Sequence, residues 1–204
     1  VNKTTQERSA LAEDLLMSTA IPVREESGTQ ASPRKQGAGL IHLDKATAAQ
    51  AYLTGADGGR PKAETGESAD GQWSFSFQLR RLQGTADIPY DLSVSVLTES
   101  VVKENGKQYI AQQASPLEAG EYTLGVPSSV TLGQDTQTIS VTLSLTEAGK
   151  ARLDRDFPNG IFVEGFVTLT PKGGEESVAL SLPYMGFYGD WTEAPVVDAT
   201  DYPA

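Results

Sequence analysis

The sequence contains no cysteine and a single histidine, His42. Without thiols there can be no disulfide, no thiolate nucleophile and no cysteine-ligated metal. A Ser/His/Asp triad needs a histidine base between its nucleophile and its carboxylate, so His42 is the one candidate for that base. It lies between Ile41 and Leu43, and the sequence has no Gly-x-Ser-x-Gly segment. A structural or surface role is therefore favoured over catalysis for His42.

Basic residues and long apolar runs are also scarce. The 16 Lys and Arg residues are outnumbered by 27 Asp and Glu residues, which gives a net charge of −11. Nucleic acids and anionic membranes are bound by basic patches, so the composition argues against both partners. No apolar run reaches the roughly 18 residues of a transmembrane helix, so no membrane span is predicted. Because the start lacks a signal pattern and Val1 is an unusual first residue, we expect a piece of a longer chain.

The first quarter of the chain predicts two helices. Thr4 and Glu7 have capping-box spacing, which predicts a helix over residues 4–20. Asp44 is a good N-cap residue and predicts a second, short helix over residues 44–52.

The first of these helices carries an apolar stripe, formed by Leu11, Leu15 and Leu16. Such a stripe needs a partner surface, because a helix of a few turns is not stable in water by itself. We expect residues 1–51 to be poorly anchored in this chain alone. The stripe then packs on the rest of the chain, packs on a neighbouring molecule, or remains mobile.

From Gln72 onward, apolar and polar residues alternate with a period of two, as in half-buried strands. Asn105-Gly106 is a strong hairpin signal, and Thr146 is expected to cap a short helical turn through Leu153. Strands are expected at 72–80, 92–96, 101–111, 130–132, 139–145, 161–170, 178–182 and 184–188, with polar connections at 24–39 and 55–71. Strands separated by turns, without a regular alternation of strands and helices, predict a mainly β fold and an antiparallel β-sandwich.

The N-terminal segment resembles the C-terminal end of the subtilisin fold. The resemblance rests on Leu-Leu-Met-Ser-Thr-Ala at 15–20, and on Gln-Gly-Ala-Gly-Leu-Ile-His-Leu at 36–43 followed by an alanine-rich helix. Gly37 and Gly39 match the glycines of the small-residue stretch that precedes the closing helix of that family. His42 departs from the Asp or Asn that is usual there, and the position is not a catalytic one in the family.

The remainder resembles the first fibronectin-type domain of the cell-envelope proteinases, the lactocepin and complement-cleaving peptidase group. Two stretches carry this resemblance: Phe-Pro-Asn-Gly-Ile-Phe-Val-Glu-Gly-Phe-Val at 157–167 and Leu-Pro-Tyr-Met-Gly-Phe-Tyr-Gly-Asp-Trp at 182–191. Their order and spacing match those of the family. The fold that the resemblance implies is an immunoglobulin/fibronectin type III-like β-sandwich, preceded by a short helical segment from the end of a subtilisin-type α/β domain.

The resemblance also implies a domain organisation and a function. Residues 1–52 would end the protease domain, 53–192 would form the sandwich, and 193–204 would link it to a following domain. The catalytic Asp, His and Ser and the oxyanion-hole Asn of such proteinases would lie upstream of Val1, so no catalytic residue is assigned in this chain. The implied partners are the upstream protease domain, the downstream fibronectin-like domains and the polypeptide substrate of the parent enzyme.

The implied function is that of a non-catalytic accessory part of an extracellular subtilisin-like serine endopeptidase at the bacterial cell surface or cell wall. An adhesion or carbohydrate-binding β-sandwich is the alternative.

Several acidic residues are candidates for a catalytic or a calcium-binding site. Asp154, Asp156 and Glu164 could act as paired carboxylates of a glycosidase, but acids before a strand commonly bond to backbone, and Glu164 is expected to be partly buried beside an arginine. Asp57, Asp70, Asp154 and Asp156 could supply oxygen ligands for calcium. The sequence has no Asp-x-Asp-x-Asp-Gly loop, which is the usual signature of such a site. No cofactor and no metal site are therefore assigned.

Two further motifs have structural explanations. Residues 56–62 contain glycines and cations, but Pro61 and the missing Gly-Lys-Ser/Thr ending contradict a phosphate-binding loop. Trp73, Phe75 and Phe77 could stack on a sugar or a peptide. Their spacing of two favours a core-facing strand instead.

Overall fold

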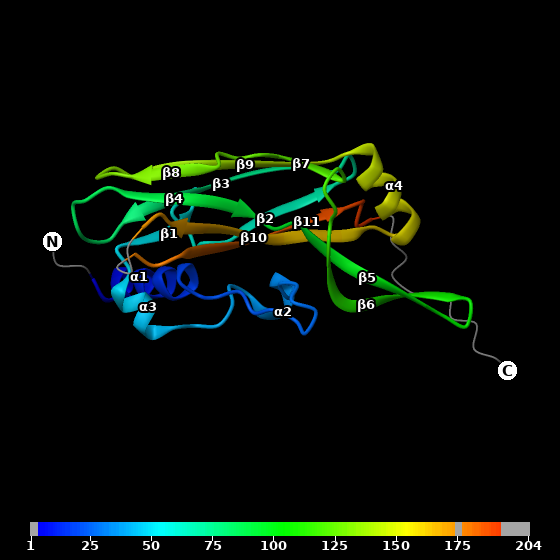
Figure 1. Cartoon of the computed structure of the whole chain (residues 1–204), viewed down its shortest axis with the longest axis horizontal. Helices are drawn as coiled ribbons and strands as arrows, with labels where there is room; N and C mark the ends of the chain where they lie inside the picture. The colour runs from blue at the N-terminus through cyan, green and yellow to red at the C-terminus, as the bar shows by residue number, and fades with distance from the viewer. Residues whose placement is uncertain (1–3, 174–176, 193–204) are drawn as a thin grey trace.

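Two β-sheets pack face to face, and three helices at the N-terminal end lie along the outer side of one of them (Figure 1). The computed structural model describes residues 4–173 and 177–192. The predicted linker, 193–204, lies outside this range. Gly174 lies outside it as well; it belongs to the turn that Lys172-Gly173-Gly174 predicts between the strands expected at 161–170 and 178–182. Along the chain, the elements are α1 (Thr5–Ser18), α2 (Pro33–Gln36), α3 (Leu43–Ala48), β1 (Ala51–Gly55), β2 (Ala63–Ser68), β3 (Gln72–Arg81), β4 (Ile88–Val94), β5 (Leu97–Glu104), β6 (Lys107–Pro116), β7 (Tyr122–Gly125), β8 (Ser129–Leu132), β9 (Gln137–Leu145), α4 (Glu147–Asp156), β10 (Ile161–Pro171) and β11 (Leu180–Tyr188).

The first sheet has the strand order β1-β3-β9-β7, with antiparallel pairing throughout. In β9 the inward residues alternate with outward ones, so that Ile139, Val141 and Leu143 are buried while Ser140 and Thr142 are exposed. This alternation places one face of the strand on the core and the other in water. On the outer face, the hydroxyls of Ser76 and Ser140 lie 2.8 Å apart across β3 and β9.

The second sheet has the order β2-β11-β10-β4-β8, and β5 and β6 form a hairpin that extends from it. Its central strand β10 is buried along most of its length because sheet and helices cover both faces. The hairpin projects beyond the sandwich in Figure 1. Its turn has positive φ at both Asn105 (51°) and Gly106 (74°), as the Asn-Gly signal predicted. The predicted mainly β sandwich class is thus confirmed, although β2 runs parallel to β11.

The predicted first helix is confirmed as α1, with both halves of its capping box formed. The Thr4 hydroxyl accepts from the Glu7 backbone N–H, and the Glu7 carboxylate accepts from the Thr4 N–H at 2.7 Å. The helix packs on β1 and β11. The buried residues of the helix are Asp14 and Ser18, whereas Leu11, Leu15 and Leu16 of the apolar stripe are only partly buried. The expectation that residues 1–51 are poorly anchored in this chain alone stays a prediction.

A buried serine fastens α1 to the edge of the first sheet. The Ser18 hydroxyl accepts from the Leu53 N–H at 2.9 Å and donates to the Leu53 carbonyl at 3.3 Å. One side chain therefore satisfies both backbone groups of an edge residue that would otherwise stay unpaired. A second serine, Ser181 on β11, donates to the carbonyl of Ala20 just after the helix.

The connection expected at 24–39 contains the short helix α2, and three further predictions of local structure were wrong. The second helix was expected to run to Tyr52, but α3 ends at Ala48 and residues 51–55 form β1. Pairing with β3 and full burial of Leu53 outweigh the helical propensity of the alanines. Asp44 lies inside α3, and the helix begins after His42 without a side-chain cap.

The second error concerns residues 55–71, which were expected to be a polar connection but contain β2. This strand is polar and is held by backbone pairing with β11. Its own residue pattern does not predict this pairing. The third error concerns the two expected strands at 178–182 and 184–188, which form the single strand β11. The short strand β7 was not predicted.

Gly165 provides a test of how tightly the second sheet is assembled. Where β4 gives way to β5, the backbone of Ser95 crosses over β10, and a Cβ atom at Gly165 would collide with the Ser95 carbonyl oxygen. We expect Gly165→Ala to lower the free energy of unfolding by more than about 2 kcal/mol, because neither backbone can move freely.

Gly133→Ala is the matched control. Its added Cβ would have the Asp87 carboxylate as nearest neighbour, at an ordinary contact distance of 3.7 Å. Urea unfolding monitored by tryptophan fluorescence should show a lower midpoint for Gly165→Ala only. Equal midpoints for the two variants would contradict the close approach.

Candidate functional site

A buried ion pair joins the helical N-terminal region, residues 4–48, to the sandwich. The Glu164 side chain on β10 is fully buried. Its carboxylate accepts two hydrogen bonds from Arg34, at 2.8 Å from Nε and 3.2 Å from Nη2. A bidentate pair of this kind is among the stronger hydrogen-bonded contacts in proteins, and it fixes orientation as well as distance.

Arg34 is held on further sides. Its Nη2 lies 3.1 Å from a carboxylate oxygen of Glu99 on β5, and its guanidinium carbon lies 4.2 Å from the ring centroid of Phe162. Burial alone would favour the neutral form of the guanidinium. The hydrogen bonds and negative charges of Glu164 and Glu99 outweigh this effect, so the pKa of Arg34 is raised above its ordinary value. The arginine therefore stays charged at every accessible pH.

Local structure positions the arginine. Ser32 caps the short helix α2, accepting from the Arg34 N–H, and Pro33 occupies the first helical position. The Gln36 amide then ties the preceding loop to α2. It donates to the carbonyls of Val23 and Ala31, at 3.2 and 2.6 Å, and its oxygen accepts from the Val23 N–H.

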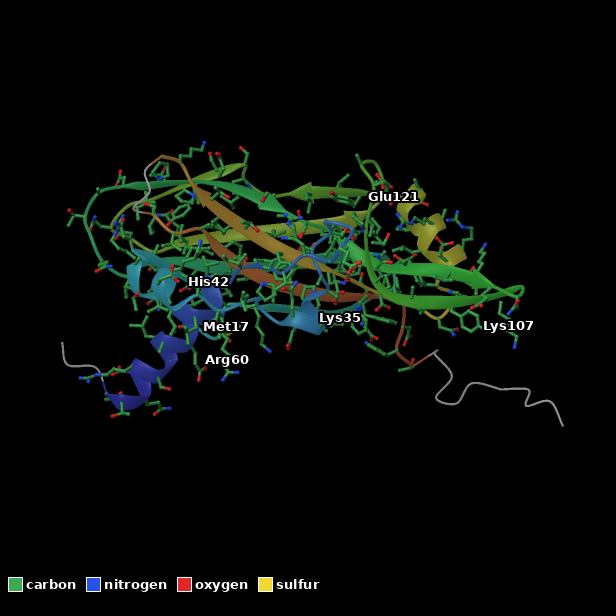
Figure 2. The ribbon with its side chains drawn as sticks, turned by 60° about the horizontal axis from the view of Figure 1, so that its bottom comes forward. Met17, Lys35, His42, Arg60, Lys107 and Glu121 are labelled. Carbon is green, nitrogen blue, oxygen red and sulfur yellow. The ribbon has the colours of Figure 1, made fainter. Side chains whose placement is uncertain are left out.

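The same loop reaches the β5–β6 hairpin. A Glu25 carboxylate oxygen accepts from the Ala114 N–H at 3.2 Å, next to the irregularity that shifts the register of the two strands. Lys35 on α2 lies 4.0 Å from the same carboxylate. Figure 2 shows Lys35 and Met17 on the side of the molecule where α1 and α2 meet the sandwich.

An aromatic cluster continues the junction toward the end of the described chain. Phe187 on β11 stacks on Trp191 with ring centroids 4.2 Å apart. Both rings also make T-shaped contacts with the ring of Phe162. Phe162 is also the ring beneath Arg34. A continuous set of contacts therefore runs from α2 to Trp191, whose side chain remains more than half exposed.

A groove of about 830 Å³ lies beside the junction. One wall is the loop between α1 and α2, including Pro22, Thr29 and Gln30. The opposite wall contains residues 93–97, where β4 passes into β5, and Tyr122. The groove is lined by polar and apolar groups in similar measure, which suits a polypeptide better than a purely apolar ligand.

Each of the three candidate glycosidase carboxylates has a structural partner. Asp154 accepts from the Tyr188 hydroxyl at 2.9 Å. Asp156 binds Arg155 through both carboxylate oxygens, and these hydrogen bonds hold the pKa of Asp156 below its usual range. Glu164 lies beside an arginine, as predicted, but its side chain is fully buried and not partly buried.

The calcium and loop candidates are likewise engaged locally. Asp57 accepts from the Gly59 N–H at 2.9 Å, within a turn that connects β1 to β2. Asp70 accepts from the Ser68 hydroxyl at 2.6 Å, and this bond lowers the pKa of Asp70. Across the described ranges, 4–173 and 177–192, no three His, Asp or Glu side chains are grouped so that they could hold a metal ion.

The remaining candidates lie in unremarkable surroundings. His42 precedes α3, with its Nδ1 atom 3.9 Å from a carboxylate oxygen of Asp44. Trp73 and Phe77 belong to the core, as the period of two predicted, and Phe75 stacks on Tyr184 with centroids 5.2 Å apart. Within the part of the chain that the structure describes, no helix combines the length and apolar character of a membrane crossing.

Sequence reasoning missed Arg34 itself. It expected an arginine beside Glu164 but could not say which, because the two residues lie 130 positions apart. No local pattern distinguishes Arg34 from the other arginines. A Ser-Pro pair just before it, at positions 32 and 33, signals a helix start but not a long-range ion pair.

These features define the class of the protein, a fibronectin-type β-sandwich with a helical region fastened to it. The sequence matches the family model of the Fn3-like domain over residues 66–185, and the chain belongs to that family.

Its relatives include the C5a peptidase of Streptococcus pyogenes, 29% identical over 204 residues, which cover 97% of this chain and 16% of that protein. The PII-type proteinase of Lacticaseibacillus paracasei is 29% identical over 195 residues, or 90% of this chain and 9% of that protein. A solved structure, the PapD-like domain 7 of human CEP192, aligns over 68% of the chain and 84% of its own length, with a TM-score of 0.42 and 16% identity. The predicted relationship to the subtilisin-like cell-envelope proteinases is confirmed, and the chain spans less than a fifth of the C5a peptidase.

A double-mutant cycle tests the ion pair. We expect Arg34→Leu to lower the free energy of unfolding by about 3 kcal/mol, because it leaves the Glu164 carboxylate buried without its main partner. Arg34→Leu combined with Glu164→Leu should recover much of this loss, since no charge is then left unpaired on β10. Chemical denaturation of the two single variants and the double variant gives the coupling.

Arg155→Leu is the control for the removal of a surface arginine. Arg155 binds Asp156, but its side chain is 68% exposed, so the unfolding midpoint should not change. If the Arg34→Leu and Glu164→Leu losses simply added, the two side chains would not act as a pair.

Proposed function

We propose that this chain is a non-catalytic accessory part of an extracellular subtilisin-like serine endopeptidase of the bacterial cell surface. In this proposal residues 1–52 end the protease domain, 53–192 form the sandwich and 193–204 lead to a following domain. The observation that carries it is the buried Arg34–Glu164 pair, which joins the helical region to the sandwich. Its role is to hold the sandwich, and the domains after it, at one orientation to the catalytic domain.

The apolar surface of the helical region supports the upstream partner. Large apolar side chains lie exposed there, at positions close together along the chain, and such patches commonly mark interaction sites. They are Ile21, Val23, Leu40, Ile41 and Leu43, each between 40% and 70% exposed. A catalytic domain of the same chain, preceding α1, is the natural partner for this patch.

The groove between the helical region and residues 93–97 supports a contribution to substrate binding. Its volume of about 830 Å³ suits several residues of an extended polypeptide. Contacts remote from the scissile bond provide binding energy that long substrates can use and short ones cannot. The parent enzyme would therefore favour long polypeptides over short peptides.

Peptidase assays on the parent enzyme and on this chain alone test the proposal. We expect the parent to cleave casein and the chain of residues 1–204 to be inactive. In the parent, Arg34→Lys keeps the charge but loses the bidentate geometry, and should reduce kcat/KM for casein at least about fivefold. The value for a short chromogenic peptide should change less than twofold.

Arg155→Lys in the parent serves as the control and should leave both substrates unaffected. Casein cleavage by residues 1–204 alone would overturn the non-catalytic assignment. Equal losses on casein and on the short peptide would contradict the substrate-binding part.

A carbohydrate-binding module is the second candidate, and Trp191 is the observation in its favour. One face of its ring stacks on Phe187, and the side chain is still 55% exposed. Exposed aromatic rings are common platforms for ligands. A glycan-array signal that disappears in Trp191→Ala would support this candidate against the first.

A further inference from the structure

The two methionines of the chain line one small hollow at the junction of the helical region and the sandwich. Met17 comes from the last turn of α1, and Met185 comes from β11. The hollow has a volume of about 180 Å³. Its other walls are mainly small or apolar, formed by Pro33, Gly37, Ala38, Ala63, Pro183 and Tyr184.

Met185 lies next to the ion pair described above. It is the direct cross-strand partner of Glu164 in the antiparallel pair of β10 and β11. Directly opposite residues in such a pair present their side chains on the same face of the sheet. The helical region therefore has the ion pair at Glu164 and, beside it, the hollow that Met185 lines.

Met17 is adjacent in sequence to a residue whose hydrogen bonds attach α1 to the first sheet. The next residue is Ser18, whose hydroxyl binds both backbone groups of Leu53. A displacement of Met17 is transmitted to this pair of hydrogen bonds because the two residues are adjacent on one helix turn.

Both thioethers are accessible to small molecules. Met17 and Met185 are only partly buried, and both line the hollow. A water molecule takes about 30 Å³ in the liquid, so a hollow of this size admits a molecule as small as hydrogen peroxide. The chain has no cysteine, so no thiol competes for the oxidant.

We propose that Met17 and Met185 form an oxidation site for peroxides, whose modification loosens the helical region from the sandwich. A sulfur lone pair attacks one oxygen of hydrogen peroxide, the O–O bond breaks and an S–O bond forms. The departing hydroxide takes the proton of the transferred oxygen and leaves as water. Sulfur loses two electrons and the peroxide gains them, so the step is balanced with hydrogen peroxide as the sole co-reactant.

The product is incompatible with its surroundings. Methionine sulfoxide is polar, and burying its oxygen in an apolar hollow costs free energy unless a donor is found. Of the charged residues that line the hollow, Lys62 and Glu64 pair with each other at 2.6 Å, and both are exposed to water. The sulfoxides therefore turn toward water. The hollow between the helical region and β11 then loses the apolar side chains of Met17 and Met185.

The test uses residues 1–204 alone and is independent of the protease function, because it measures oxidation and backbone exchange. The chain is treated with hydrogen peroxide and followed by peptide mass spectrometry, hydrogen exchange and thermal unfolding. We expect a sulfoxide at both methionines and amide exchange about tenfold faster across residues 5–48, because local opening there becomes easier. Tm should fall by roughly 3 °C.

Met17→Leu combined with Met185→Leu is the matched control, since leucine keeps the apolar volume but cannot be oxidised. Its exchange and Tm should not respond to peroxide. Methionine sulfoxide reductases should restore slow exchange in the oxidised wild-type chain.

Two results would overturn the proposal. One is complete sulfoxide formation with unchanged exchange across residues 5–48. The other is an equal response to peroxide in the double leucine variant, which would place the sensitive group elsewhere.

Discussion

The position of the helical region depends on one buried carboxylate. Glu164 has no exposed surface, and a charge in that setting is tolerated only when it is paired and hydrogen-bonded. Arg34 supplies both oxygens with donors, and it can do so only if α2 lies directly over β10. The cost of leaving this group unpaired therefore selects one placement of the helical region. Directionless apolar contacts could not select it as sharply.

Hydrogen bonds elsewhere along the helical region also attach it to the sandwich. Ser18 fastens α1 to β1, the Glu25 carboxylate fastens the following loop to β6, and Ser181 fastens the end of α1 to β11. Each is a side chain that satisfies a backbone group. Together they tie the helical region to both sheets and to the hairpin, which is what a rigid connection between domains requires. The relatives of this chain are long proteinases, and the accessory role proposed here rests on that rigidity.

The sandwich itself is an ordinary product of alternating sequence. Where one residue in two is apolar, as in β3 and β9, a single core follows from burying the apolar faces of two sheets. The strand β10 departs from this pattern because it is covered on both sides, and its glycine, Gly165, gives room to the Ser95 backbone. The helical region lies over the same strand. The close backbone approach at Gly165 and the ion pair at Glu164 therefore lie at neighbouring positions of one strand.

The sequence by itself determined those features whose causes are local. The capping box at Thr4 and Glu7, the Asn105-Gly106 turn and the period of two in β3 and β9 each depend on residues only a few positions apart. The strand pattern predicted the sandwich, and the family resemblance added the relationship to proteinases. Only the tertiary structure decided that residues 51–55 and 63–68 are strands, because their pairing with β3 and β11 outweighs weak local preference. It alone identified Arg34 as the partner of Glu164, since a contact across 130 residues is selected by the energy of a buried charge and not by any pattern along the chain.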